Sequence, residues 1–230
     1  MYAGAPAIIL RTRIPPPAPV LTPTYLSTQT TTTDETTTTF SGISIGTPHP
    51  KRIVVIAGHH GVAAAATATL NGTAHHFRSQ NTAHEFSLFM WMVPLGDTAD
   101  IAVSATSSIR KAFSIYYLYP ANPVPTFSGT ATAATTTNAT IANFKCDYGG
   151  SLIYAGGQHA TLGAFTTTFS GQTITEDVDA QYESASSYTT GRISDVSVSS
   201  SAVTLDLGET VSGTKRLTAA SWGPAWGRYL

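Results

Sequence analysis

Apolar and polar residues alternate in short runs along most of the chain, and turn-forming residues separate the runs. The runs lie at 40–46, 51–58, 66–77, 85–96, 99–106, 111–120, 139–144, 150–157, 163–171, 172–183, 186–193, 202–209 and 216–223. Alternation with a period of two indicates β-strands, and no window of helical length shows a convincing period of 3.6 residues. The pattern therefore predicts an all-β fold, an antiparallel β-sandwich of jelly-roll-like type. The run at 51–58 is apolar enough to be a central strand.

Two connections stand out between these runs. Asn71-Gly72 lies between alternating flanks, which is the strongest short-range signal for a two-residue hairpin. In that register His75 faces Ala68 and His76 faces Thr67. The Pro- and Thr-rich segment 120–138 is expected to be a link between strands.

The first 37 residues differ from the rest of the chain. We expect residues 1–37 to form an extended Pro/Thr-rich arm and residues 38–230 to form the sandwich domain, because each proline fixes φ and restricts the residue before it. A disordered leader and an arm that crosses a neighbouring subunit both fit this composition. In the second case the apolar residues would be buried on the partner and the arginines would orient the segment. The partner-contacting residues would be Ile8, Ile9, Leu10, Arg11, Arg13 and Tyr25.

Composition narrows the classes of partner. Charged residues make up 11% of the chain, apolar residues 42%, and the formal net charge is −1. A protein that binds nucleic acid needs a basic stripe facing the phosphates, and this chain has none, so no nucleic-acid partner is expected. A Thr- and Ser-rich surface with so little charge is better suited to a permanent assembly than to a free domain.

Other segments point away from disulfides, membranes and export. The chain has one cysteine, Cys146, which excludes an internal disulfide. No apolar run approaches the ~18 residues that span a membrane. The N-terminal residues lack a basic n-region, so no signal peptide is expected.

Two histidine pairs, His59-His60 and His75-His76, raise the question of a metal site. Adjacent residues of a strand point to opposite faces, so neither pair can hold one ion together. Among these positions His59 and His84 alone could lie opposite each other. No Cys, Asp or Glu nearby in the sequence completes a set of three or four ligands. We therefore expect exposed or turn histidines, and neither a metal nor another cofactor.

Residues 42–46 fit the G-x-S-x-G pattern of a hydrolase nucleophile elbow, with Ser44 as the nucleophile. That elbow needs a sharp turn from a strand into a helix. The following residues enter another strand, so Ser44 is predicted to be an outward-facing strand residue.

Four carboxylates lie close together at Glu176, Asp177, Asp179 and Glu183. Asp177 and Asp179 are expected to share one face of a strand, and two carboxylates in a cleft could hydrolyse a glycoside. A row of like charges more often marks a solvated edge that discourages pairing with another sheet. We favour the edge, and expect no catalytic residue.

The C-terminal segment carries three large aromatic residues, Trp222, Trp226 and Tyr229, in a stretch broken by Gly and Pro. Such a segment either packs back over the sandwich or fills a pocket on a neighbouring subunit. All three are therefore candidate partner contacts.

Several segments together resemble a known class of proteins. In order, they are FSGISIGTPHPKRIVVIAG, VPLGDTADIAVSAT, SIYYLY, GGSLIYAGG and AASWGP, preceded by a Thr/Ser-rich lead. From about residue 25 to residue 225 this layout resembles the small β-rich virion proteins of tailed bacteriophages, of the type found in phages of alphaproteobacteria. The resemblance implies a virion component, made in the host cytoplasm, that serves as a capsid decoration, a collar, or a tail or fibre accessory. It supplies no active-site residue.

The sequence thus predicts a virion structural protein that is not an enzyme and acts through subunit contacts. Its partners would be copies of itself, with a trimer as one option, and other virion proteins. The alternative is a carbohydrate-binding or host-adhesion module that uses surface aromatic residues and takes a glycan as ligand. A polysaccharide hydrolase built on Asp177 and Asp179 ranks third.

Overall fold

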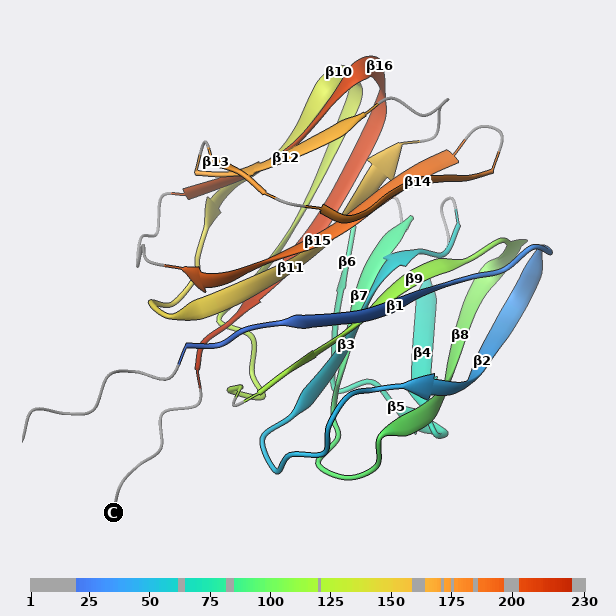
Figure 1. Ribbon diagram of the computed structural model, residues 1–230. Helices are drawn as coiled ribbons and strands as arrows, with labels where there is room; N and C mark the ends of the chain where they lie inside the picture. Colours follow the sequence, from blue (N-terminus) through green and yellow to red (C-terminus); the bar gives the residue numbers. More distant parts are fainter. Residues whose placement is uncertain are drawn as a thin grey trace, which may run out of the picture.

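The computed structural model shows an all-β protein made of antiparallel strands (Figure 1). The structure describes residues 20–61, 65–81, 85–119, 121–158, 164–170, 172–174, 176–183, 186–196 and 203–224. In these ranges no helix is long and apolar enough to cross a membrane. The predicted fold class, an antiparallel β-sandwich, is confirmed, and its strands form three sheets of five, four and seven strands.

The five-stranded sheet, called here the central sheet, is buried on both faces. Its strands in spatial order are β1 (Thr24–Thr30), β9 (Ala112–Leu118), β3 (Ile53–His59), β7 (Phe86–Met92) and β6 (Phe77–Gln80). All seven residues of β3 are buried. Val54 and Ile56 face one apolar core, whereas Ile53 and Val55 face another. A strand covered on both sides needs a continuous apolar run, which is why the segment at 51–58 stood out in the sequence.

The four-stranded sheet, called the outer sheet, packs on one face of the central sheet. Its strands in order are β2 (Glu35–Ser44), β8 (Thr98–Ile109), β4 (Ala66–Leu70) and β5 (Thr73–Ala74). The core between the two sheets includes Trp91 and Phe113 of the central sheet and Val103 of the outer sheet. The 71–72 hairpin joins β4 to β5 in the expected register, with φ of 48° at Asn71 and 78° at Gly72.

The seven-stranded sheet, called the curled sheet, covers the other face of the central sheet. Six of its strands in spatial order are β13 (Gln172–Thr173), β12 (Phe165–Phe169), β16 (Val203–Trp222), β11 (Gly150–Gln158), β15 (Ser186–Val196) and β14 (Glu176–Glu183). The seventh, β10 (Phe127–Phe144), pairs with the edge of β16 that faces away from β11 and β12. The register between β10 and β16 shifts near the middle of both strands. The sheet closes around a core of its own, in which Tyr154 and Leu217 join Leu207 and Phe169.

The sandwich therefore has three layers, with the central sheet between the outer and curled sheets (Figure 1). The layer between the central and curled sheets contains Val55 and Met90 from one side and Ile153, Ala220 and Trp222 from the other. Apolar side chains from strands far apart in the sequence thus meet in the middle of the molecule.

Strand boundaries differ from the sequence prediction at two places. Residues 24–30 of the expected arm form β1 and pair with β9, and β2 begins at Glu35. Most of the expected link at 120–138 belongs to β10, which begins at Phe127. Threonine is β-branched and favours extended backbone, and in 127–144 no proline interrupts it, so this polar stretch extends a sheet.

Candidate interaction site

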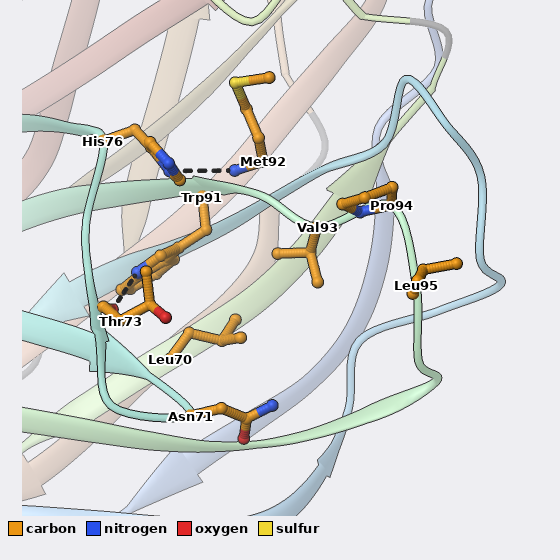
Figure 2. Close-up of a pocket in the computed structure, with 9 residues that line it drawn as sticks. All are labelled: Leu70, Asn71, Thr73, His76, Trp91, Met92, Val93, Pro94 and Leu95. Carbon is orange, nitrogen blue, oxygen red and sulfur yellow. Dashed lines mark hydrogen bonds between the residues drawn. The ribbon is translucent and has the colours of Figure 1, made fainter.

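An open groove of about 300 Å³ lies beside the 71–72 hairpin (Figure 2). One wall comes from the hairpin that joins β4 to β5 in the outer sheet, and the other from the end of β7 and the loop after it. The lining residues are Leu70, Asn71, Thr73, His76, Trp91, Met92, Val93, Pro94 and Leu95. The groove leaves no signal in the sequence, because its two walls are about twenty residues apart and meet only in the folded chain.

The lining is mainly apolar, and two of its polar side-chain atoms are hydrogen-bonded within the protein. Trp91 Nε1 donates to the Thr73 carbonyl at 3.0 Å, and His76 Nδ1 accepts from the Met92 amide at 3.2 Å. Met92 is 50% exposed and Leu95 is 78% exposed at the rim. The groove therefore suits an apolar side chain.

A buried arginine fixes the loop that forms one wall. Arg52 is 1% exposed, and its guanidinium donates to the carbonyl oxygens of Gly46, Val93, Leu95 and Gly96 at 2.5 to 2.8 Å. A planar guanidinium has five N–H donors in a fixed geometry, so it can hold several carbonyls at once. The loop after β7 is thereby held against the loop before β3.

The structure corrects the expectation of exposed histidines for the first pair. His59 and His60 are 3% and 0% exposed, and His60 Nε2 lies 2.8 Å from Ser87 Oγ. The second pair is divided as the hairpin predicts: His75 bonds to Ala68, whereas His76 leaves the hairpin and its amide donates to the Met90 carbonyl of β7. The expected pairing of His76 with Thr67 is replaced by this crossing to the central sheet.

In the part of the chain that the structure describes, no group of three or more His, Cys, Asp or Glu side chains is placed to hold a metal ion. His84, the expected neighbour of His59, lies outside the described residues.

Ser44 is the last residue of β2 and is exposed, and it pairs with Thr98 of β8. Its position confirms the predicted outward-facing strand residue. The next segment leads to β3, so no helix follows Ser44 to form a nucleophile elbow.

The four carboxylates lie on β14, which is an edge strand of the curled sheet, as predicted. The expectation that Asp177 and Asp179 share a face is wrong. The register against β15 shifts between Glu176 and Val178, and a bulge of this kind turns a side chain to the other side. Asp177 forms an ion pair with Arg192 at 3.3 Å, whereas Asp179 accepts from the Phe165 amide at 3.2 Å.

These carboxylates have structural partners that account for their positions. Glu176 Oε1 accepts from both the amide and the hydroxyl of Thr167, at 3.1 and 2.9 Å. Burial raises the pKa of Glu176, Asp177 and Asp179 above the ordinary carboxyl range, and Arg192 opposes the shift at Asp177. Asp177 and Asp179 therefore contact different strands, with Arg192 on β15 as the partner of one and Phe165 on β12 as the partner of the other.

Trp222 is fully buried between the central and curled sheets, with its ring 6.5 Å from that of Phe77. This placement corrects the expectation of a partner contact for Trp222 and supports its packing back over the sandwich. Tyr25 is half-buried, and its hydroxyl bonds to Thr28 at 3.0 Å. The other candidate contacts lie outside the described residues: Ile8, Ile9, Leu10, Arg11, Arg13, Trp226 and Tyr229.

Exposed aromatic rings of the described chain are tyrosines. Tyr148 is 60% exposed and Tyr119 is 38% exposed. Tyr119 stacks on both Tyr117 and His49, with ring centroids 5.7 and 4.7 Å apart. Ring faces that stack on one another are not available to a sugar, so Tyr148 is the better platform of the two.

Comparison with known proteins gives little beyond the overall type of fold. No family model matches the chain, and no curated protein matches it in sequence. The chain is similar in structure to the major capsid protein P2 of bacteriophage PM2, with a TM-score of 0.31 and 12% identity over 90% of this chain and 99% of that one. It is also similar to an anti-sigma factor domain-containing protein, with a TM-score of 0.23 and 9% identity over 82% of this chain and 79% of that one. At these TM-scores neither likeness bears on function.

Proposed function

We propose that this protein is a structural component of a bacteriophage virion and acts through contacts between subunits. The observation that carries the proposal is the low number of charged residues on the protein surface. The chain has few charged residues, and among the residues that the structure describes five are buried: Arg52, Glu85, Lys111, Glu209 and Lys215.

These buried charges hold the fold together. Lys215 and Glu209 form an ion pair at 3.4 Å with neither side chain exposed, and Arg216 donates to Glu85 at 2.5 Å across the central and curled sheets. Burying a charge is costly unless it is paired or hydrogen-bonded; Glu209 and Lys215 are paired within β16, and Glu85 is paired with Arg216 from a distant strand.

The surface that remains is dominated by threonine, serine and alanine. Surface charge keeps free proteins apart in solution, and a surface without it favours association. A subunit that is permanently assembled in a particle does not need charge repulsion to keep it soluble. The proposed partners are copies of this chain and other virion proteins, and the proposed location on the particle is a capsid decoration, a collar or a tail accessory.

Purified particles test this proposal. Quantitative mass spectrometry of particles made by the phage that encodes the chain should find it in a fixed high copy number after density-gradient purification. Immunogold electron microscopy would then locate it on head, neck or tail. Absence of the chain from gradient-purified particles would overturn the proposal.

Glycan binding is the second candidate, and the exposed ring of Tyr148 favours it. A glycan array with the isolated protein tests it directly. Binding that is lost in a Tyr148→Ala variant and kept in a Tyr119→Ala variant would support adhesion, and an array without signal would reject it.

A further inference from the structure

Strand β10 is an edge strand of unusual length and composition. It covers the 18 residues Phe127–Phe144 and, in the described part of the chain, pairs with β16 alone. Its sequence contains no charged residue and no proline. An edge strand presents a row of unpaired amide and carbonyl groups, so an unprotected one is a template for pairing with another chain.

The other edges of the described sheets are protected in ways that β10 is not. β14 carries carboxylates, β6 is four residues long and carries Arg78, and β5 and β13 are two residues long. β2 carries Glu35 and is irregular near Gly42, and the register of β1 against β9 is interrupted between Tyr25 and Ser27. Charges, short length and irregular register are the usual devices against pairing at an edge.

The first part of β10 is regular enough to pair. From Phe127 to Ala133 its register against β16 runs without a shift, over a length of roughly 20 Å. Ser128, Thr130 and Thr132 are exposed, whereas the side chains of Phe127, Ala131 and Ala133 pack on the core of the curled sheet. The bulges that bend the strand follow Ala133.

We propose that 127–133 of β10 pairs antiparallel with the same segment of a second copy of this chain, which joins two curled sheets into one. The inference rests on the proposed function, because it names one of the subunit contacts that the function requires. A two-fold axis places a strand opposite itself, so any charge on the strand would face its own kind. Segment 127–133 carries none, and its exposed side chains are the small Ser128, Thr130 and Thr132.

A heterologous partner has no comparable support. A partner selected by charge would need a charged counterpart on β10, and a partner selected by side-chain pockets would need large side chains or hollows along the strand. The exposed positions of this segment are small hydroxyl residues, which favour main-chain pairing as the source of affinity.

Sedimentation velocity of the full chain tests the proposal. The wild-type protein should form dimers as concentration rises, and a Thr130→Lys/Thr132→Lys variant should remain monomeric, because like charges facing each other across a strand pair oppose pairing. The matched control is Thr67→Lys/Thr106→Lys, which adds the same charge at exposed threonines of the outer sheet and should leave the dimer intact. A wild-type monomer at about 1 mM, where even millimolar affinity would be visible, overturns the proposal, and so does a dimer that the β10 lysines leave unchanged.

Cysteine scanning then reports the register. Three single-cysteine variants are made: Ser128→Cys, Thr130→Cys and Thr132→Cys. Each is oxidised alone, and the variants at neighbouring exposed positions are also mixed in pairs and oxidised. The yield of cross-linked dimer should be highest for the variant or pair nearest the two-fold axis and low for the others. The native Cys146 does not compete, because it is buried and burial raises the pKa of its thiol to about 12. Equal or absent cross-linking across the series overturns the β10 contact.

Failure of this proposal and failure of the proposed function are separate results. If the protein dimerises through β10 but is missing from particles, the β10 contact is supported and the virion role is rejected. If the protein is abundant in particles but its dimerisation is unaffected by the β10 lysines, the virion role is supported and the β10 contact is rejected.

Discussion

The Nε atom of Arg52 donates a hydrogen bond to the Val93 carbonyl at 2.7 Å, which ties the start of β3 to the loop after β7. The other guanidinium nitrogens bond to the carbonyls of Gly46, Leu95 and Gly96. One side chain thus satisfies four carbonyls and shapes a wall of the groove in Figure 2.

Replacement of Arg52 by Met should lower the free energy of unfolding by at least about 3 kcal/mol, because four carbonyls lose a charged donor and each such hydrogen bond is worth about 1.5 to 3 kcal/mol. Arg52→Lys should rescue little of this loss, since an ammonium group lacks the planar fork. Urea denaturation measures both variants. Arg110→Ala is the control, because the Arg110 side chain is 40% exposed and its ion pair with Asp34 spans 3.8 Å, so a change within about 1 kcal/mol is expected. An Arg52→Met variant as stable as that control would contradict the role given to Arg52.

The hairpin offers a test of backbone strain alone. Gly72 has a φ of 78°, and a Cβ added there meets nothing within 4 Å. Gly72→Val should therefore destabilise the protein by about 1 to 3 kcal/mol through strain and without a clash. Gly72→Asn should stay closer to wild type, because Asn tolerates positive φ better. Equal denaturation midpoints for Val and Asn would mean that strain at this turn is unimportant.

Glu176 predicts a particular dependence of stability on pH. Burial raises its pKa in the folded protein, so the folded state binds more protons than the unfolded state above the ordinary Glu pKa of about 4.3. The contribution of Glu176 to the free energy of unfolding is therefore fully favourable below about pH 4.3, and it is lost as the pH rises through the pKa that Glu176 has in the folded protein. Glu176→Gln keeps an acceptor oxygen for Thr167 and removes this loss, so the variant should gain stability relative to wild type as the pH rises.

Urea midpoints of wild type and Glu176→Gln between about pH 4 and pH 7 measure the difference. Glu176→Ala serves as the control, because it leaves the amide of the buried Thr167 without its acceptor and should destabilise at every pH. Parallel pH profiles for wild type and the Gln variant would contradict the shift.

Trp222 distinguishes a core residue from a partner contact. Because its ring is fully buried between two sheets, Trp222→Ala should destabilise the isolated chain by about 3 to 5 kcal/mol. Tyr148→Ala removes a ring that is 60% exposed and should change stability by about 0.5 kcal/mol or less. Thermal denaturation of both variants gives the comparison, and an unchanged midpoint for Trp222→Ala would return this residue to the list of partner contacts.

The sequence by itself determined those features that local backbone chemistry controls. The 71–72 turn followed from Asn-Gly, because both residues tolerate positive φ. The outward position of Ser44, the central place of β3 and the edge position of β14 followed from alternation, apolar content and charge. Each of these depends on a few neighbouring residues.

Tertiary structure decided which face of each strand is covered. A period of two shows that a strand has two faces, but the residues that cover a face can lie more than a hundred positions away in the sequence, as for Trp222 and Phe77. The burial of His59 and His60 depends on the same distant packing. The bulge that separates Asp177 from Asp179 appears only when β14 is set against β15.

The same reason explains why the sequence predicted a strand at 139–144 but missed residues 127–138 of β10. Its alternating small and hydroxyl residues have too little apolar content to signal a buried strand, and the partner that holds them, β16, lies about eighty residues further along the chain. Main-chain hydrogen bonds to that distant strand fix its structure, and hydrogen bonds of this kind leave little trace in local composition. The sequence therefore determined the strands that bury apolar side chains, whereas the tertiary structure decided how they stack and where an unprotected edge remains.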